Sequence, residues 1–127
     1  MIHQEIALAA PVATIYQTLT NSQRFSEMTG GVSADLSAEQ GAQFSCFGGM
    51  IHGRNIELVE NKRIIQAWRA KPWREGLYSI VSFELIDEGA QSRLILTHTG
   101  FDEDQLQHLT QGWQENYWQP MQQYLLK

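Results

Sequence analysis

The feature that most constrains this fold is a long apolar stripe at the C-terminal end of a chain whose middle alternates like β-strands. With residues placed about 100° apart on a helix, five large apolar side chains fall within about 60° of Leu106: Leu109, Trp113, Tyr117, Met121 and Tyr124. A stripe of this width is typical of a helix that packs one face on a core. The rest of the chain must therefore supply a broad apolar surface to cover it.

The ends and interior of this helix carry further signals. Asp102, Glu103 and Asp104 complement the positive N-terminal end of the helix dipole. Pro120 removes one backbone donor and crowds the carbonyl of Asn116, so the sequence predicts a bend there.

Residues 32–99 are strand-like almost throughout. Short turn signals punctuate them at 39–41, 48–49, 60–62, 72–76 and 87–90. Short turns join antiparallel neighbours. The predicted strands place apolar side chains on one face of a sheet: Ile64 and Trp68 with Gln66; Leu77, Val81, Phe83 and Leu85; Leu94 and Leu96 with His98. This face is the surface that the C-terminal helix needs.

The N-terminal region predicts a strand and two short helices. Residues 2–8 alternate as a half-buried strand does, and Pro11 suits the first turn of a helix. Asn21 or Ser22 can cap a second helix, which Gly30 and Gly31 end. With 127 residues the chain forms one domain, 1–127, of the α+β class.

Composition excludes several functions. The net charge of −5 and the scattering of nine basic residues argue against nucleic-acid binding. No apolar run reaches the roughly 18 residues of a membrane span, and the N-terminus lacks the pattern of a signal peptide. One cysteine, Cys46, permits no internal disulfide. The sequence therefore predicts a cytoplasmic protein with no membrane span.

Four sequence words point to a family. They are FGGMIHGRNIELVENKRIIQAWR at 47–69, WREGLYSIVSFEL at 73–85, LTHTGF at 96–101 and GWQENYW at 112–118. They resemble the family of activators of the heat-shock protein 90 ATPase, in the domain that is C-terminal in the eukaryotic co-chaperone and stands alone in many bacterial proteins. Arg74 departs from the family, which commonly has proline there.

The resemblance implies the helix-grip fold of the START or SRPBCC superfamily, which includes the birch-pollen allergen. In this fold a curved antiparallel sheet of about six to seven strands wraps around the long C-terminal helix, and two short helices follow the first strand. The eukaryotic activator has a separate N-terminal domain that engages the chaperone, and a chain of this length has no room for it. Co-chaperone activity therefore does not transfer with the family name.

The residue types that carry chemistry show no catalytic or metal-binding pattern. The four histidines, His3, His52, His98 and His108, lack ligand spacing, and Cys46 has no recognisable base. The glycines at 48, 49 and 53 are followed by no Lys-Ser or Lys-Thr pair of a phosphate loop. We therefore predict no catalytic residue, no metal and no cofactor. Because helix-grip relatives include cyclases and hydrolases, an unrecognised activity of that kind is the third hypothesis.

Two other hypotheses rank higher. The first is a non-enzymatic module that binds a small apolar or amphipathic ligand in a cavity between sheet and helix. Its predicted lining is Phe25, Met28, Phe44, Gln66, Trp68, Phe83, Leu96, His98, Trp113, Tyr117 and Met121. The alternative interpretation of the same residues is a filled core with no cavity.

The second hypothesis is a domain that associates with a chaperone of the heat-shock protein 90 type through the Trp73 loop. Its predicted contacts are Trp73, Arg74 and Trp118. The alternative is that the two tryptophans bind no partner and fold back onto the edge of the domain.

Overall fold

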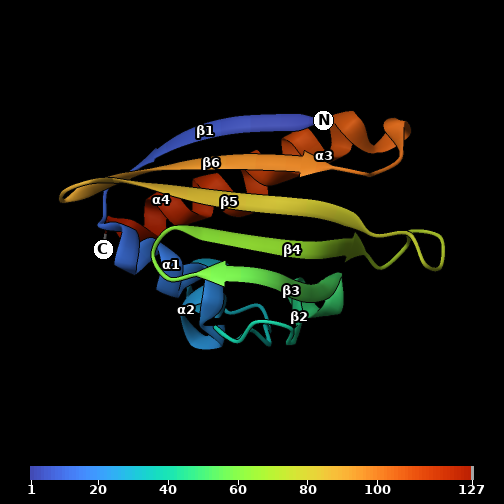
Figure 1. Ribbon diagram of the computed structural model, residues 1–127, viewed down its shortest axis with the longest axis horizontal. Coiled ribbons are helices and arrows are strands. Elements are labelled where there is room, and N and C mark those ends of the chain that lie inside the picture. Colours follow the sequence, from blue (N-terminus) through green and yellow to red (C-terminus); the bar gives the residue numbers. More distant parts are fainter. Residues whose placement is uncertain (127) are drawn as a thin grey trace.

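One antiparallel sheet organises the molecule. The computed structural model describes residues 1–126. The strands are β1 (Ile2–Leu8), β2 (Gln43–Cys46), β3 (Ile51–Val59), β4 (Arg63–Ala70), β5 (Ser79–Glu88) and β6 (Gln91–Thr99), in the spatial order β1-β6-β5-β4-β3-β2 (Figure 1). The C-terminal helix runs diagonally behind β5 and β6. This arrangement confirms the α+β helix-grip fold, with six strands.

Two short helices follow β1 as predicted. They are α1 (Val12–Thr20) and α2 (Ser22–Met28). The Asn21 side chain accepts a hydrogen bond from the Arg24 amide at 2.9 Å, which satisfies one of the free donors at the start of α2. After Met28, Gly30 and Gly31 have φ of 82° and 97°, in the region that favours glycine and ends a helix.

The segment between α2 and β2 differs from the prediction. Residues 32–38 were expected to be strand-like, and this was wrong: they form an irregular loop with one isolated bridge, Asp35 to Ser45, and the turn predicted at 39–41 follows it. The Ser22 hydroxyl and the Leu36 backbone exchange two hydrogen bonds, at 2.7 and 2.9 Å, which tie the loop to α2. These bonds between a side chain and the backbone take the place of the backbone hydrogen bonds that would pair a strand with its neighbour.

The C-terminal helix contains a widened turn. Its parts are a 3₁₀ turn (Glu103–Gln105), α3 (Leu106–Gly112), a π-helical turn (Trp113–Trp118) and α4 (Gln119–Leu125), which holds Pro120 in its first turn. A π turn has one more residue than an α turn, so the residues after it lag by about 100°. An unbroken α-helix would place Trp118 about 120° from Leu106, at the margin of the apolar stripe. The π turn brings it into the core instead, where it is 1% exposed.

The sheet and the helices enclose a single core. Val81, Leu94, Leu96 and Met121 are completely buried in it, as is Ile15 from α1. Gly53 on β3 is required by this packing, because a Cβ there would overlap the Ala67 carbonyl on β4. No helix among residues 1–126 is long and apolar enough to cross a membrane.

Candidate functional site

The space beneath the C-terminal helix has a closed end. Side chains from α1, α2, β2, β4, β5 and the helix meet there around a void of about 10 Å³. A single water needs at least that much room, so this end is filled. The residues around the void are Leu19, Phe25, Leu36, Phe44, Cys46, Gln66, Phe83 and Tyr117.

The other end of the same space is open. A groove of about 430 Å³ lies between the Phe47–Ile51 segment, the loop from β4 to β5 and the first half of the C-terminal helix. Its volume falls in the range of small-molecule sites. Its walls are largely apolar, from Phe47, Met50, Ile51, Trp68, Trp73, Leu109 and Trp113, with polar groups from Gln105, His108, Asn116 and Tyr117. Among the described residues, no Asp, Glu, Lys or Arg lines this groove.

Stacked indoles form the inner wall of the groove. The Trp68 and Trp113 rings lie 5.5 Å apart at 30°, and the Trp73 ring meets Trp68 edge-on at 5.7 Å. Trp68 is 3% exposed, yet its Nε1 finds no acceptor within the part of the chain that the structure describes. A buried donor without a partner carries a desolvation cost of about 1–3 kcal/mol. The nitrogen itself is sealed from solvent, so a molecule in the groove meets the face or edge of the indole and not this donor.

A buried chain of hydrogen bonds fixes these indoles. Trp113 Nε1 donates to Nδ1 of His98 at 3.1 Å, and His98 Nε2 lies 2.8 Å from the Ser79 hydroxyl. That hydroxyl donates to the Trp68 carbonyl at 2.7 Å. Because Nδ1 accepts, the hydrogen-bond network assigns the ring proton to Nε2. Burial lowers the pKa of His98 to about 3, so the ring is neutral near pH 7.

The buried thiol of Cys46 and the buried hydroxyl of Tyr117 are also neutral near pH 7. Burial raises the pKa of Cys46 to about 12 and holds the pKa of the Tyr117 hydroxyl well above its usual range. Cys46 Sγ and the Tyr117 oxygen lie 3.8 Å apart. A thiol this hard to ionise is a poor nucleophile. No group of three His, Cys, Asp or Glu residues within 1–126 is placed to hold a metal ion.

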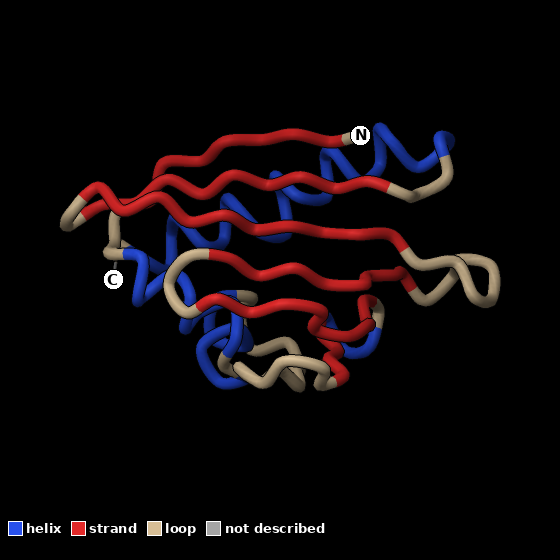
Figure 2. Tube along the Cα trace, viewed as in Figure 1, coloured by secondary structure: helices blue, strands red, loops and turns tan. Residues whose placement is uncertain are grey.

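Arg69 shapes the loop that borders the groove. Its guanidinium donates to the backbone carbonyls of Trp73, Arg74 and Leu77 at 2.7, 3.0 and 3.1 Å. The loop it holds, residues 71–78, extends beyond the end of the sheet (Figure 2). Arg69 is 7% exposed, so these bonds are shielded from water. They keep Trp73 beside Trp68 at the mouth of the groove.

The predicted lining residues divide between the two ends. Trp68, Trp113 and Tyr117 line the open groove, whereas Phe25, Phe44, Gln66 and Phe83 surround the closed end with Tyr117. Met28, Leu96, His98 and Met121 are buried and line neither space. Phe47, Met50 and His108 are among the groove residues that the sequence did not predict. A large apolar residue next to two glycines, as at Met50, was the available signal.

The predicted partner contacts are also separated. Trp73 lies half-buried at the groove mouth, and Arg74 is exposed and pairs with Asp102 at 3.3 Å. Trp118 is buried and donates from Nε1 to Gln4 Oε1 at 2.6 Å. Trp73 and Arg74 are therefore accessible, and Trp118 is not.

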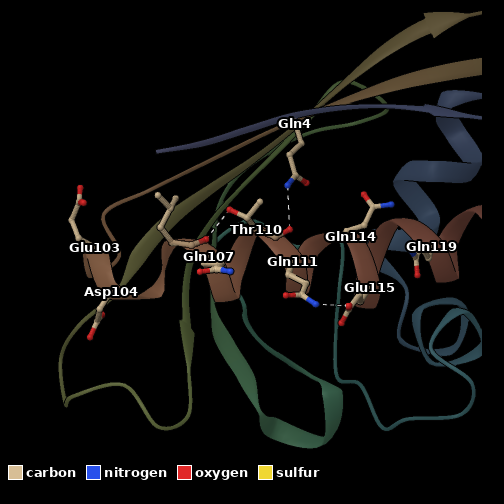
Figure 3. Close-up of a pocket in the computed structure, with 10 residues that line it drawn as sticks. Gln4, Glu103, Asp104, Gln107, Thr110, Gln111, Gln114, Glu115 and Gln119 are labelled. Carbon is tan, nitrogen blue, oxygen red and sulfur yellow. Dashed lines mark hydrogen bonds between the residues drawn. The ribbon is translucent and has the colours of Figure 1, made fainter.

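A second groove, polar and more open, runs between β1 and the outer side of the C-terminal helix. Its volume is about 770 Å³, and five of its ten lining residues are glutamines: Gln4, Gln107, Gln111, Gln114 and Gln119. In Figure 3, Gln4 reaches from β1 to the helix, where its amide donates to the Thr110 carbonyl at 3.3 Å.

A family model matches most of this chain. Residues 9–126 match the family described as Activator of Hsp90 ATPase homolog 1-like protein. The chain belongs to this family. It is 28% identical over 120 residues to human activator of 90 kDa heat shock protein ATPase homolog 1, covering 94% of this chain and 35% of the human protein. Mouse homolog 2 is 33% identical over 86 residues, covering 68% of this chain and 26% of that protein. The chain thus spans about a third or less of these relatives.

Solved structures share the fold. A crystal structure described as an HSP90 activator from Plasmodium falciparum matches with a TM-score of 0.83 and 24% identity, over 92% of this chain and 91% of that one. The solution structure of the Aha1 dimer from Colwellia psychrerythraea matches with a TM-score of 0.81 and 19% identity, over 98% and 96%. At these identities the likeness shows the helix-grip fold.

Proposed function

We propose that this domain is a non-enzymatic binding module, and that its ligand is a small, neutral and largely apolar molecule held in the open groove. One observation carries the proposal: the open groove, of about 430 Å³, is large enough for a ligand and has largely apolar walls that include two stacked indoles. The apolar body of such a ligand would cover the stacked indoles, and a carbonyl or ether oxygen on it would accept a hydrogen bond from a polar group of the wall such as the Asn116 amide.

The charge of the groove selects the ligand class. Because the lining contains no Asp, Glu, Lys or Arg among the described residues, an ionised ligand would lose its hydration without gaining a charged partner. His98 behind the wall is neutral near pH 7. These features favour an uncharged ligand over a fatty acid or an amine.

The test uses prodan, a neutral fluorescent naphthalene that carries a ketone. In the groove its emission shifts to the blue, and titration gives a dissociation constant. Met50→Lys places a charge at the groove, and we expect it to weaken binding by about tenfold or more. Ile56→Lys is the matched control, since Ile56 and Met50 are 45% and 49% exposed and Ile56 does not line the groove. Equal binding by both variants would place the probe elsewhere.

A second candidate function is association with a chaperone of the heat-shock protein 90 type. The names of the relatives favour it, since the matched human and mouse proteins are called activators of that chaperone's ATPase. The exposed Arg74 and the half-buried Trp73 offer the contact surface. This chain covers about a third of the human activator, so the activity of that whole protein is here a proposal.

The chaperone hypothesis is tested by co-precipitation with the purified chaperone and by its ATPase rate. Trp73→Ala and Arg74→Glu should each reduce the amount bound, and Ile56→Lys should not. Met50→Lys separates the two functions, because it blocks the groove and leaves Arg74 exposed. A chaperone that neither binds the chain nor changes its ATPase rate would exclude this function.

A further inference from the structure

We propose that the free edge of β1 is a self-association surface, on which two copies of this chain pair antiparallel about a two-fold axis at Gln4. β1 is the outermost strand of the sheet and, among the described residues, its ladder partner is β6 alone (Figure 1). Its other side presents backbone groups that a further strand can bind.

The two edge strands of the sheet, β1 and β2, differ in length and in how far their outer backbone groups are covered. The opposite edge, β2, has four residues, and Asp35 covers it through two backbone hydrogen bonds with Ser45, at 2.8 and 3.0 Å. β1 has seven residues in unbroken register, without a bulge, a proline or a lysine. Proteins usually protect an exposed edge strand with a bulge, a proline or a charged side chain such as lysine. Apart from the charge of Glu5, β1 has no such protection, which marks it as the edge that takes a partner.

The free backbone groups of β1 follow from the hairpin between β5 and β6. Its two-residue loop makes Glu88 and Gln91 a hydrogen-bonded pair, and such pairs recur at alternate positions. Ser92, Leu94, Leu96 and His98 therefore turn their backbone groups toward β1. The register pairs these four with Leu8, Ile6, Gln4 and Ile2. His3, Glu5 and Ala7 are left with their amides and carbonyls at the free edge.

Charge selects the register between two copies. An axis at Gln4 places His3 of one copy opposite Glu5 of the other, twice by symmetry, and these side chains are 54% and 51% exposed. An axis at Glu5 would instead set two glutamates against each other, which is destabilising. Opposite pairing of an imidazole and a carboxylate favours the axis at Gln4.

The polar groove beside β1 suits a second copy as the occupant. Glutamine amides both donate and accept hydrogen bonds, so the glutamines of the groove are complementary to a second copy of themselves. The three carboxylates that also line it, Glu103, Asp104 and Glu115, repel their copies and must lie at the rim of the contact. A two-fold interface brings the same patch of both copies together and needs such self-complementarity. Gln107, Gln111 and Gln114 lie along the helix under this edge, as Figure 3 shows, and are exposed.

The first test measures mass in solution by sedimentation velocity across a concentration series. We expect the 14.5 kDa chain to sediment as a dimer at the upper concentrations. Glu5→Pro removes a free-edge amide without breaking the β1–β6 ladder and should leave monomer only. A parent chain that is monomeric throughout, or a dimer that survives Glu5→Pro with an unchanged circular dichroism spectrum, would overturn the proposal.

The second test determines the register. His3→Glu and Glu5→His each create like-type pairs and should weaken the dimer by about tenfold, since each change acts twice. The double variant restores the opposite pairing and should restore the dimer. Mixed His3→Cys and Glu5→Cys chains should form a disulfide-linked dimer under mild oxidation, because paired Cα atoms lie about 5.5 Å apart. Cross-linking of Glu5→Cys alone would show the axis at Glu5 and contradict the proposal.

Discussion

The two ends of the space beneath the C-terminal helix are built from the same helix and the same sheet, yet one is filled and the other is open. The closed end retains about 10 Å³ and the open groove about 430 Å³. Aromatic side chains are abundant at both. Aromatic content alone therefore does not decide whether a helix-grip domain holds a cavity; the segments that cover each end do.

Three rings separate the two ends. Phe25 from α2, Phe47 from the turn after β2 and Tyr117 from the π turn meet edge-on, with centroids 5.3–5.7 Å apart. Tyr117 borders both spaces. On one side, α1 and α2 cover the sheet; on the other, the cover is the loop 71–78, which Arg69 holds by three hydrogen bonds. Where α1 and α2 cover the sheet the space is filled, and where the loop 71–78 covers it the groove stays open.

The largest effect should come from emptying the closed end. Phe83 is 2% exposed there, so Phe83→Ala should lower the free energy of unfolding by about 3–5 kcal/mol in urea titration. Met50→Ala, at the open end, is the control and should cost no more than about 1 kcal/mol. Similar losses for both variants would mean that the two ends do not differ in packing.

Acid should act on the buried histidine behind the open end. The pKa of His98 is about 3 in the folded chain against 6.5 for a free histidine. Between these values the unfolded chain binds a proton that the folded chain does not, so stability falls as pH falls from 6.5 toward 3. The slope from this residue is about 1.4 kcal/mol per pH unit. Urea titrations at several pH values measure it.

A matched variant separates the contribution of His98 to the pH dependence of stability from that of the carboxylates, which titrate over the same pH range. His98→Asn keeps an acceptor near the position of Nδ1 for Trp113 and has no proton to gain. Its stability should be lower at pH 7, and its pH profile should lack the histidine slope. Parallel profiles for the parent and the variant would show that His98 is protonated in the folded state.

Loosening the loop should change the open end alone. Arg69→Met removes three charge-assisted hydrogen bonds, and we expect a loss of about 2 kcal/mol in unfolding free energy. Amide hydrogen exchange should rise in residues 71–78 and stay unchanged around Phe83. Arg69→Lys keeps the charge but not the planar fork, so it should resemble Arg69→Met. Faster exchange at both ends would contradict the division.

Local patterns in the sequence explain how much of this architecture was predictable. Period-two alternation identified β1 and the inner faces of β4 to β6, except that Leu77 lies in the loop before β5. The 100° stripe identified the C-terminal helix, and both patterns depend on neighbours along the chain. Residues 32–38 escaped prediction since their conformation depends on contacts with Ser22 and Asn55, which lie far away in sequence. The burial of Trp118 depended on a π turn, and Pro120 signalled an irregularity in that part of the helix but not its kind.

The site was less predictable than the fold for a related reason. Trp68, Trp113 and Tyr117 could be placed toward the space beneath the helix from periodicity, but periodicity does not reveal where that space is full. The groove depends on Phe47, which has a φ of 54°, and on a loop fastened by Arg69 from the sheet. A side chain such as Arg69 that binds the backbone carbonyls of a loop produces no periodic pattern in the sequence.

The smallest effect should come from the ion pair at the mouth. Arg74 and Asp102 lie 3.3 Å apart, but their side chains are 70% and 49% exposed, so water and salt screen their attraction. Asp102→Asn should change the unfolding free energy by no more than about 0.5 kcal/mol and prodan affinity by less than about twofold. If the affinity instead fell by tenfold and the loss vanished in high salt, the ion pair would be the latch of the groove. The open end would then depend on surface charge, and the buried bonds of Arg69 would not suffice to maintain it.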